Sequence, residues 1–386
     1  MGIIYETPTL NSEELAVVAS IDEVRGRVSY ALRVSKRWHG LLRRSVFGRN
    51  IQGSNTIEGY NVTVEDAIAA VEGEEPLEAG DEAWAAVVGY RNAMSYVLQL
   101  SDDPHFNYNE SLLRSLHYMM LQHDLSKNPG RWRPGYIAVR NEQTGEVVYE
   151  GPDADLVPSL IGALVDSLNA SANDTPAMIR AALGHLNLAM IHPFSDGNGR
   201  MARCLQTLVL AREGILEPQF CSVEEYLGKF TQEYYQVLAE VGQGTWHSNN
   251  DPRPWIRFSL TAHYRQAKTI LRRIRETERL WDELERLVTH HDLPDRTILA
   301  LAEAAWGRKV RNATYRPIAE VTENLASRDL AELVAHGLLV PNGEKRGRYY
   351  VASELIKAIR SNTREPRLQI EDPFEFNKDQ PTLFPR

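Results

Sequence analysis

Apolar residues recur every three or four positions along most of the chain, which is the spacing of one face of an α-helix. The stretches with this pattern are residues 13–46, 63–71, 84–100, 109–121, 156–168, 175–191, 199–214, 222–241 and 255–290. A glycine-bearing segment, residues 48–59, is expected to separate the first two of these helices. Strand-like segments at 136–140 and 146–149 surround a polar turn and predict a short β-hairpin. This part of the chain is therefore predicted to be mainly α-helical.

Two of the predicted helices stand out by their composition. Residues 175–191 are apolar on nearly every side, so we expect a buried central helix that ends before Pro193. Residues 255–290 carry many arginines with interleaved acids, and we expect a solvated helix face there instead of a strip that binds nucleic acid.

The pattern changes after Pro294. Helical stretches at 298–305 and 322–336 precede two short apolar segments, 338–340 and 349–351, around a basic turn. Beyond residue 361 the chain is polar and contains prolines, so we expect a loosely ordered tail. The predicted organisation is an N-terminal helical region (1–110), a core with supporting helices (111–290), a C-terminal module (291–360) and the tail (361–386).

Length and charge narrow the class of protein. The chain has 386 residues and a formal net charge of −9, whereas a nucleic-acid coat would be basic, so any DNA contact must come from a local patch. The two cysteines, Cys204 and Cys221, exclude a disulfide-stapled secreted fold and indicate a reducing compartment. Without a signal peptide or an apolar run near 18 residues, we expect a cytoplasmic protein with no membrane partner.

The most informative stretch is residues 192–203, which read His-Pro-Phe-Ser-Asp-Gly-Asn-Gly-Arg-Met-Ala-Arg. Gly197 and Gly199 flank Asn198 at the predicted start of a helix. Glycine lets backbone N–H groups turn toward one point, and the free N–H groups of a helix N-terminus add to such an anion-binding site.

Charged side chains surround this glycine turn. Arg200 and Arg203 lie three positions apart and share a helix face, so together they are suited to bind more than one phosphate group. Asp196 is placed to hold Mg²⁺, which commonly bridges carboxylate and phosphate oxygens. His192 precedes the turn and can take up a proton near neutral pH. The combination indicates attack of a hydroxyl on a nucleotide phosphate.

Each feature also has an ordinary structural interpretation. A histidine at a helix end commonly caps or packs, a Gly-Asn-Gly sequence is commonly a turn, and two arginines at this spacing commonly form a solvated face. Asp196 could simply cap the following helix. His192 and Asp196 could also be two ligands of a zinc site, but no third ligand of suitable spacing is nearby. The features are individually ordinary, and their combination favours the catalytic interpretation.

The stretch 192–203 matches every fixed position of the Fic family signature, His-x-Phe-x-Asp/Glu-Gly-Asn-Gly-Arg-x-x-Arg, so the chain resembles that family. The resemblance implies a mainly α fold: a Fic-type helical core with the hairpin at 136–149 as a flap, plus a C-terminal winged-helix domain. It also implies transfer of AMP from ATP, with Mg²⁺, to a Tyr, Thr or Ser hydroxyl of a target protein, which can be the chain itself.

The resemblance assigns roles to individual residues. His192 would be the base that deprotonates the attacking hydroxyl, and Asp196 would hold Mg²⁺. The residues expected to bind the phosphates are Gly197, Asn198, Gly199, Arg200 and Arg203, with Asn198 adding its side-chain amide. Phe194 would anchor the turn in the core, and the flap would pair with an extended segment of the target. The motif leaves the adenine contacts open.

Residues Ser54, Glu58 and Gly59 match the family's inhibitory pattern, Ser/Thr-x-x-x-Glu-Gly/Asn. Glu58 would form a forked salt bridge with Arg203 and take the place of the outermost phosphate, with Ser54 hydrogen-bonding nearby. The alternative is an ordinary exposed glutamate on a connecting loop. The same glutamate could orient a water that removes AMP from a target, so a de-AMPylating enzyme stays open.

The C-terminal module is the candidate DNA-binding part. Segment 308–348 holds eight basic and five acidic residues, a net charge of +3 in a chain of −9. The side chains expected to contact DNA are Thr322, Asn324, Ser327 and Arg328 on a recognition helix and Lys345, Arg346 and Arg348 on a wing. Protein contacts are the alternative use of this module.

Two further partners follow from weaker signals. Residues 380–384, Gln-Pro-Thr-Leu-Phe, are similar to the Gln-x-x-Leu-Phe peptides that dock on bacterial sliding clamps. A homodimer is also compatible with the sequence. The rival to an enzyme is a DNA-binding regulator whose Fic core senses ATP, but sensing would not need the intact His192.

Overall fold

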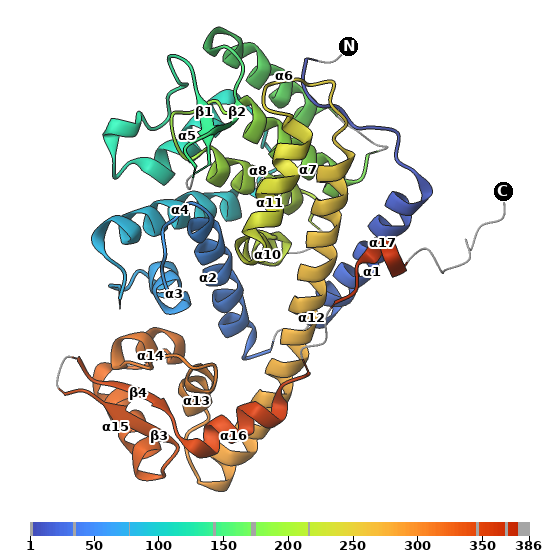
Figure 1. Ribbon diagram of the computed structural model, residues 1–386. Coiled ribbons are helices and arrows are strands. Elements are labelled where there is room, and N and C mark those ends of the chain that lie inside the picture. Colours follow the sequence, from blue (N-terminus) through green and yellow to red (C-terminus); the bar gives the residue numbers. More distant parts are fainter. Residues whose placement is uncertain are drawn as a thin grey trace.

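The computed structural model describes residues 3–33, 36–76, 78–141, 144–170, 175–214, 217–344, 347–366 and 370–376. These residues form helices and two short antiparallel hairpins, which confirms the prediction of a mainly α protein (Figure 1). A large helical body carries the glycine turn. A smaller group of helices and strands lies at the far end of the long helix α12 (Arg253–His290) (Figure 1).

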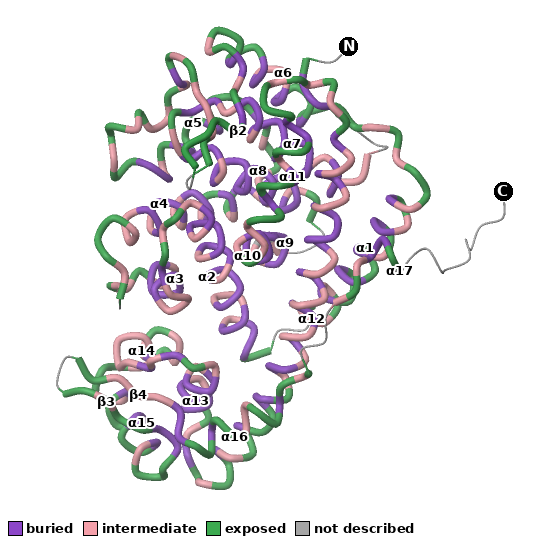
Figure 2. The backbone as a smooth tube through the Cα atoms, viewed as in Figure 1, coloured by how far each residue is buried: buried purple, intermediate pink, exposed green. Residues whose placement is uncertain are grey.

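The N-terminal helices are α1 (Ser12–Arg33), α2 (His39–Ile57), α3 (Val64–Glu72) and α4 (Asp81–Leu100). The expected interruption over 48–59 is wrong, because α2 continues through Gly48 and Gly53. An added Cβ on Gly48 would lie 2.5 Å from Cγ1 of Ile68, and one on Gly53 would lie 2.5 Å from the backbone oxygen of Glu224. These glycines do not break the helix but let α2 pack closely against its neighbours, and α2 is largely buried (Figure 2).

The centre of the body consists of α7 (Ala177–Ile191) and α8 (Asn198–Arg212), which are buried along almost their whole length (Figure 2). The prediction of a buried central helix that ends before Pro193 is thereby confirmed. The helices that complete the body are α5 (Glu110–Leu121), α6 (Val157–Asn169), α9 (Pro218–Cys221), α10 (Glu224–Lys229) and α11 (Thr231–Gly242).

The single helix expected over 222–241 is wrong, because the chain bends at Phe230 (φ −120°, ψ 45°) between α10 and α11. An added Cβ on Gly228 would lie 2.8 Å from Cα of Gly53, so the backbones of α10 and α2 touch. The bend allows α10 to pack against α2 while α11 packs against α12.

The predicted hairpin is confirmed as β1 (Ala138–Arg140) and β2 (Val147–Glu150), which pair antiparallel. Glu142 and Gln143 of its turn lie outside the described residues. The buried Tyr149 donates a hydrogen bond to the backbone oxygen of Met190 at 2.8 Å. This contact fixes the hairpin to the last turn of α7, beside the glycine turn.

The C-terminal group contains α13 (Thr297–Ala305), α14 (Asn312–Ala319), α15 (Glu323–Ala335), β3 (Leu339–Asn342), β4 (Tyr349–Ala352) and α16 (Glu354–Thr363). The expected helices and hairpin are present, and α14 and α16 are additions that the pattern did not predict. Asn324, Ser327 and Arg328 are exposed on α15, whereas Lys345 and Arg346 lie outside the described residues. DNA binding by this group stays a prediction.

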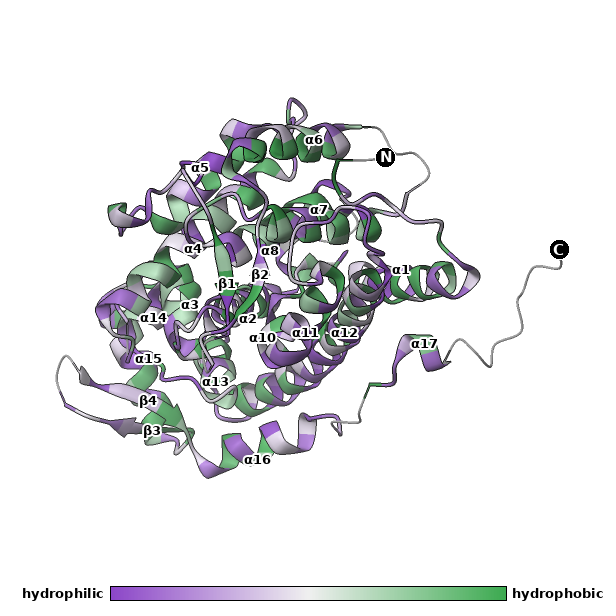
Figure 3. Cartoon of the chain, turned by 45° about the horizontal axis from the view of Figure 1, so that its top comes forward, coloured by the Kyte–Doolittle hydropathy of each residue, from purple (hydrophilic) through white to green (hydrophobic). Residues whose placement is uncertain are grey.

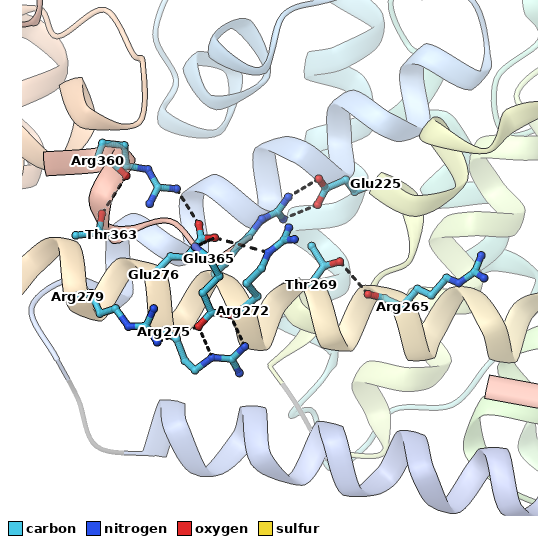
Figure 4. A network of polar contacts seen from close by, with 11 residues as sticks. Glu225, Arg265, Thr269, Arg272, Arg275, Glu276, Arg279, Arg360, Thr363 and Glu365 are labelled. Atoms are coloured by element: carbon cyan, nitrogen blue, oxygen red, sulfur yellow. Dashed lines mark hydrogen bonds and ion pairs between the residues drawn. The ribbon is translucent and has the colours of Figure 1, made fainter. Parts of the chain in front are cut away.

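The solvated face expected for the arginines of α12 is present only in part: Arg279 and Arg286 are 54% and 73% exposed, whereas others bind carboxylates from remote parts of the chain (Figure 4). Arg273 binds Glu225 through two hydrogen bonds of 2.6 Å, and Arg275 binds Glu365 at 2.6 and 2.8 Å. Their carboxylate partners come from α10 and from the segment after α16, so the arginines join distant parts of the chain. The interleaved pattern showed the charges but not these long-range partners.

In the part of the tail that the structure describes, residues 361–366 and 370–376, two segments contact the helical body. Glu365 is held by α12, and a short helix, α17 (Pro373–Phe376), places the ring of Phe374 4.3 Å from the guanidinium carbon of Arg257. The clamp-like peptide at 380–384 lies outside the described residues, so that partner stays a prediction.

Hydrophobic and hydrophilic residues alternate along the surface helices, as α12 and α16 show in Figure 3. Of the helices that the structure describes, none combines the length and the apolar character needed to cross a lipid bilayer.

The glycine contact between α2 and α10 leads to a test of stability. Gly53→Ala should lower the free energy of unfolding by about 1–3 kcal/mol, because the new methyl group overlaps the backbone of α10. Gly26→Ala is the matched control: Gly26 lies in α1 with nothing within 4 Å of an added Cβ, so it should be neutral or stabilising by up to about 1 kcal/mol. Urea unfolding measures both, and equal shifts would contradict the close packing.

Candidate active site

The turn between α7 and α8 depends on two left-handed residues. His192 ends α7 with φ 50° and ψ 58°, and Gly197 begins α8 with φ 75° and ψ 11°. An added Cβ on Gly197 would lie 3.0 Å from Cδ1 of Leu121 and 3.6 Å from Nη2 of Arg200. Glycine therefore serves both the backbone conformation and the close approach of Leu121, whereas the contact with Arg200 is an ordinary one.

Asn198 braces this turn from within. Its side-chain oxygen accepts a hydrogen bond from the N–H of Phe194 at 2.9 Å, and its Nδ2 donates to the oxygen of Phe194 at 2.8 Å. These bonds use one of the two N–H groups of Nδ2, and contact of the Asn198 amide with phosphate stays a prediction. Phe194 is fully buried, as expected of a core anchor.

His117 of α5, the helix that precedes the hairpin, is a positioning residue at this turn. Its ring stacks on Phe194 with centroids 3.7 Å apart. Because Nδ1 accepts the N–H of Gly130 at 2.8 Å, the proton lies on Nε2, which donates to the backbone oxygen of Asp196 at 2.9 Å. Burial lowers the pKa of His117 to about 4, so the ring stays neutral and keeps this pattern of hydrogen bonds.

His192 has the tautomer that a general base requires. Its Nδ1 lies 3.1 Å from the backbone oxygen of Ala189, which can only accept, so Nδ1 carries the proton. The neutral ring then has an unprotonated Nε2. Burial lowers the pKa of His192, which keeps the imidazole neutral near pH 7. Arg133 holds the residue in place by donating to its backbone oxygen at 2.8 Å.

Arg200 is a buried cation with no hydrogen-bond acceptor among the residues that the structure describes. The ring of Tyr60 lies 5.1 Å from its guanidinium carbon. A buried cation whose N–H groups lack hydrogen-bond acceptors is costly, so this guanidinium indicates a place for an anion that binds from outside the chain. The first turn of α8 adds backbone N–H groups that have no partner within the helix.

Arg203 is engaged by the predicted inhibitory residues. Its Nε donates to Oγ of Ser54 at 2.8 Å, and its Nη2 donates to the backbone oxygen of Ser54 at 3.0 Å and to Oε1 of Glu58 at 2.7 Å. The pairing is therefore not the forked salt bridge that we expected, since Ser54 takes the second edge of the guanidinium. Burial alone would lower the pKa of Arg203, but the charge and hydrogen bond of Glu58 act together with Tyr234 and Tyr90 to raise it.

Glu58 closes over the start of α8. An added Cβ on Gly199 would overlap Oε1 of Glu58, so the carboxylate lies directly against the glycine backbone. The side chain of Glu58 is only 19% exposed, which excludes the alternative of an ordinary exposed glutamate. Gly59, the third residue of the pattern, has φ 81° and ends the α2 segment.

Asp196 has partners on both oxygens. Oδ1 accepts the N–H of Gly197 at 2.6 Å, and Oδ2 lies 2.7 Å from Nζ of Lys127. The N–H of Gly197 is thus used within the turn. Burial alone would raise the pKa of Asp196, but Lys127 and Arg200 lower it, so the group is a carboxylate near neutral pH.

A metal would have one protein carboxylate here. Within the described ranges no three His, Cys, Asp or Glu side chains gather into a metal-binding cluster, so the zinc alternative lacks support. A single partly exposed carboxylate beside the unpartnered Arg200 fits Mg²⁺, which keeps several waters and commonly binds one or two carboxylates together with substrate phosphates.

The residues that sequence reasoning missed are Lys127, Tyr60 and Arg133. Each lies on an element remote in sequence from the residues it contacts or orients at the turn, and none belongs to a recognisable motif. His117 differs from them, because the sequence shows it as a histidine in the helix before the predicted flap hairpin.

Comparisons with known proteins agree with this geometry. Residues 107–210 match the model of the Fic/DOC family. The chain is 26% identical over 258 residues to protein adenylyltransferase Fic of Nematostella vectensis, an alignment that covers 65% of this chain and 55% of that protein. It is 38% identical over 96 residues to protein adenylyltransferase fic-1 of Caenorhabditis elegans, which covers 25% of this chain and 16% of that protein. The chain thus spans at most about half the length of these relatives.

Solved structures show the same fold. A Fic family protein from Desulfovibrio desulfuricans has a TM-score of 0.58 at 24% identity, covering 91% of this chain and 99% of that one. A Fic domain containing signaling protein from Bacteroides thetaiotaomicron has a TM-score of 0.54 at 23% identity, covering 66% of this chain and 96% of that one. The match of residues 107–210 shows that the chain contains a Fic domain, and the solved structures show that it shares their fold.

The bracing role of Asn198 can be tested by unfolding. Asn198→Ala leaves the N–H and C=O of the buried Phe194 without their partners, so the free energy of unfolding should fall by about 1–3 kcal/mol for each group. Asn107→Ala, at an exposed residue, should change it by less than about 0.5 kcal/mol. Indistinguishable urea midpoints would show that the turn does not depend on the amide.

Proposed function

We propose that this protein transfers AMP from ATP to a Tyr, Thr or Ser hydroxyl of a protein. The observation that carries the proposal is the buried guanidinium of Arg200, which lacks an acceptor among the described residues and lies at the N-terminus of α8. The names of the matched relatives, which are protein adenylyltransferases, support it. The alignment covers about half of the Nematostella vectensis protein, so the activity and its target are part of the proposal.

In the proposed reaction, Nε2 of His192 takes the proton of the attacking hydroxyl as its oxygen bonds to the α-phosphorus of ATP. The bond from that phosphorus to the bridging oxygen breaks, and pyrophosphate leaves. Arg200 and Arg203 would hold the outer phosphates and stabilise the charge that develops on the leaving group. Mg²⁺ bound at Asp196 would neutralise phosphate charge.

The target would reach the site beside the β1–β2 hairpin. Tyr136, Val147 and Val148 are exposed there, at 70%, 39% and 40%. An extended segment pairing with a strand edge would present its side chains alternately to the hairpin and to His192. A segment of the chain itself is one candidate target, which a self-labelling assay would detect.

Glu58 would restrain the reaction, since a carboxylate that binds Arg203 and covers Gly199 competes with phosphate for the same positive groups. The alternative role of Glu58 is to hold a water that removes AMP from a target. The position of the carboxylate against the backbone of Gly199 favours competition with phosphate over this alternative.

Removing the carboxylate should therefore activate AMP transfer. Glu58→Gly should raise self-labelling from labelled ATP by about 10- to 100-fold, which corresponds to losing about 1.4–2.8 kcal/mol of competition. Glu58→Gln should have a smaller effect in the same direction, and Glu23→Gln, at an exposed residue of α1, should have none. Adding His192→Ala should abolish labelling while ATP binding persists. Unchanged labelling in Glu58→Gly would refute the restraint.

The pH dependence tests the base. In the Glu58→Gly protein, kcat/KM for ATP should fall on acidification with a midpoint below the ordinary histidine value of about 6.5, because burial lowers the pKa of His192. The charge of Glu58 raises that pKa, so its removal should move the midpoint further toward acid. Equilibrium ATP binding over the same pH range controls for protonation of the nucleotide. A midpoint at or above 6.5 would argue against His192 as the base.

A further inference from the structure

A polar cluster on Asp196 is not explained by the reaction described above. Lys127 ends a short 3-10 helix, Leu125–Lys127, and places Nζ 2.7 Å from Oδ2 of Asp196. The same Nζ donates to the hydroxyl of Tyr60 at 3.2 Å. The side chains of Lys127 and Asp196 are 28% and 35% exposed, so the pair is only partly screened by solvent.

Lys127 stands where a metal ion would need to bind. Oδ1 of Asp196 already accepts the N–H of Gly197, which leaves Oδ2 as the oxygen better placed for Mg²⁺. Mg²⁺ binds carboxylate oxygens at about 2.0–2.1 Å, and an ammonium group at hydrogen-bond distance from the same oxygen would repel it. The two cations are therefore competitors for one carboxylate.

Tyr60 connects this lysine to the segment that carries Glu58. The chain turns at Gly59, and the N–H of Tyr60 bonds to the backbone oxygen of Asn55 at 3.0 Å. One short segment thus contacts three cations: Glu58 binds Arg203, and Tyr60 places its ring beside Arg200 and its hydroxyl on Lys127.

We propose that Lys127 is a second restraint on this protein, which occupies the Asp196 carboxylate in the resting state and competes with the divalent metal, with Tyr60 holding it in place. The inference rests on the proposed AMP transfer, in which Asp196 holds the metal. It differs from the restraint by Glu58, because it acts on the metal and not on the outer phosphates. Release of Arg203 alone would then activate the protein in part, and full activation would also require that Asp196 be released from Lys127.

Binding of Mn²⁺, used as a spectroscopic probe in place of Mg²⁺, tests the inference without any turnover. Free Mn²⁺ is measured by electron paramagnetic resonance with the full chain and the non-transferable ATP analogue α,β-methylene-ATP. Lys127→Met should tighten Mn²⁺ binding about 10-fold or more, Tyr60→Phe less, and Lys127→Arg, which keeps the charge, should leave it within about 2-fold of wild type. Lys357→Met, at an exposed lysine of α16, is the matched control and should have no effect.

The effect must pass through Asp196. In an Asp196→Asn protein, Lys127→Met should no longer tighten Mn²⁺ binding, and circular dichroism with thermal unfolding verifies that each variant is folded. Unchanged or weaker Mn²⁺ binding in folded Lys127→Met, checked with Lys127→Gln, would overturn the inference. Tighter binding without AMP transfer in any Glu58 variant would leave the metal competition intact and refute the proposed reaction instead.

Discussion

Two buried guanidinium groups at the start of α8 impose the main electrostatic constraint on this molecule. The N-terminus of a helix is already positive, so Arg200 and Arg203 add like charge where the field is least favourable for it. Among the described residues a carboxylate hydrogen-bonds to one of them: Arg203 is bound by Glu58 and by the hydroxyl and carbonyl of Ser54, whereas Arg200 has no acceptor. The remaining positive charge favours binding of a polyphosphate, and the Glu58 carboxylate weakens that binding.

The fold brings helices that are remote in sequence to the turn between α7 and α8, where they place the charged groups. α7 and α8 place His192 and the arginines on either side of Gly197, α5 holds the turn through His117, and α2 delivers Glu58. Neutral histidines at positions 117 and 192 avoid adding further positive charge to a crowded region. Backbone hydrogen bonds, ring stacking and burial therefore keep the two arginines and Glu58 in place and keep both histidines neutral.

Local features were largely predictable from the sequence, because proline, glycine and helical periodicity act over a few residues. The end of α7, the hairpin and the pairing of Glu58 with Arg203 follow from such signals or from motif resemblance. Long-range geometry was not predictable. The direction of the Asn198 amide depends on a side-chain rotamer, and the bend at Phe230 depends on packing between α10 and α2. The ion pair of Lys127 with Asp196 joins residues 69 positions apart, and no sequence motif links them.

The contact between Gly53 and Gly228 extends this dependence to positions with no chemistry of their own. Gly53 lies little more than one turn before Glu58, the residue that caps the C-terminus of α2, so the close packing at Gly53 helps to position the segment that carries the carboxylate. A slightly wider spacing would loosen the internal anion before it unfolded the molecule. The basal rate of the proposed enzyme would then depend on how closely two helices pack. Substitutions in the interior could raise that basal rate without changing any reactive group.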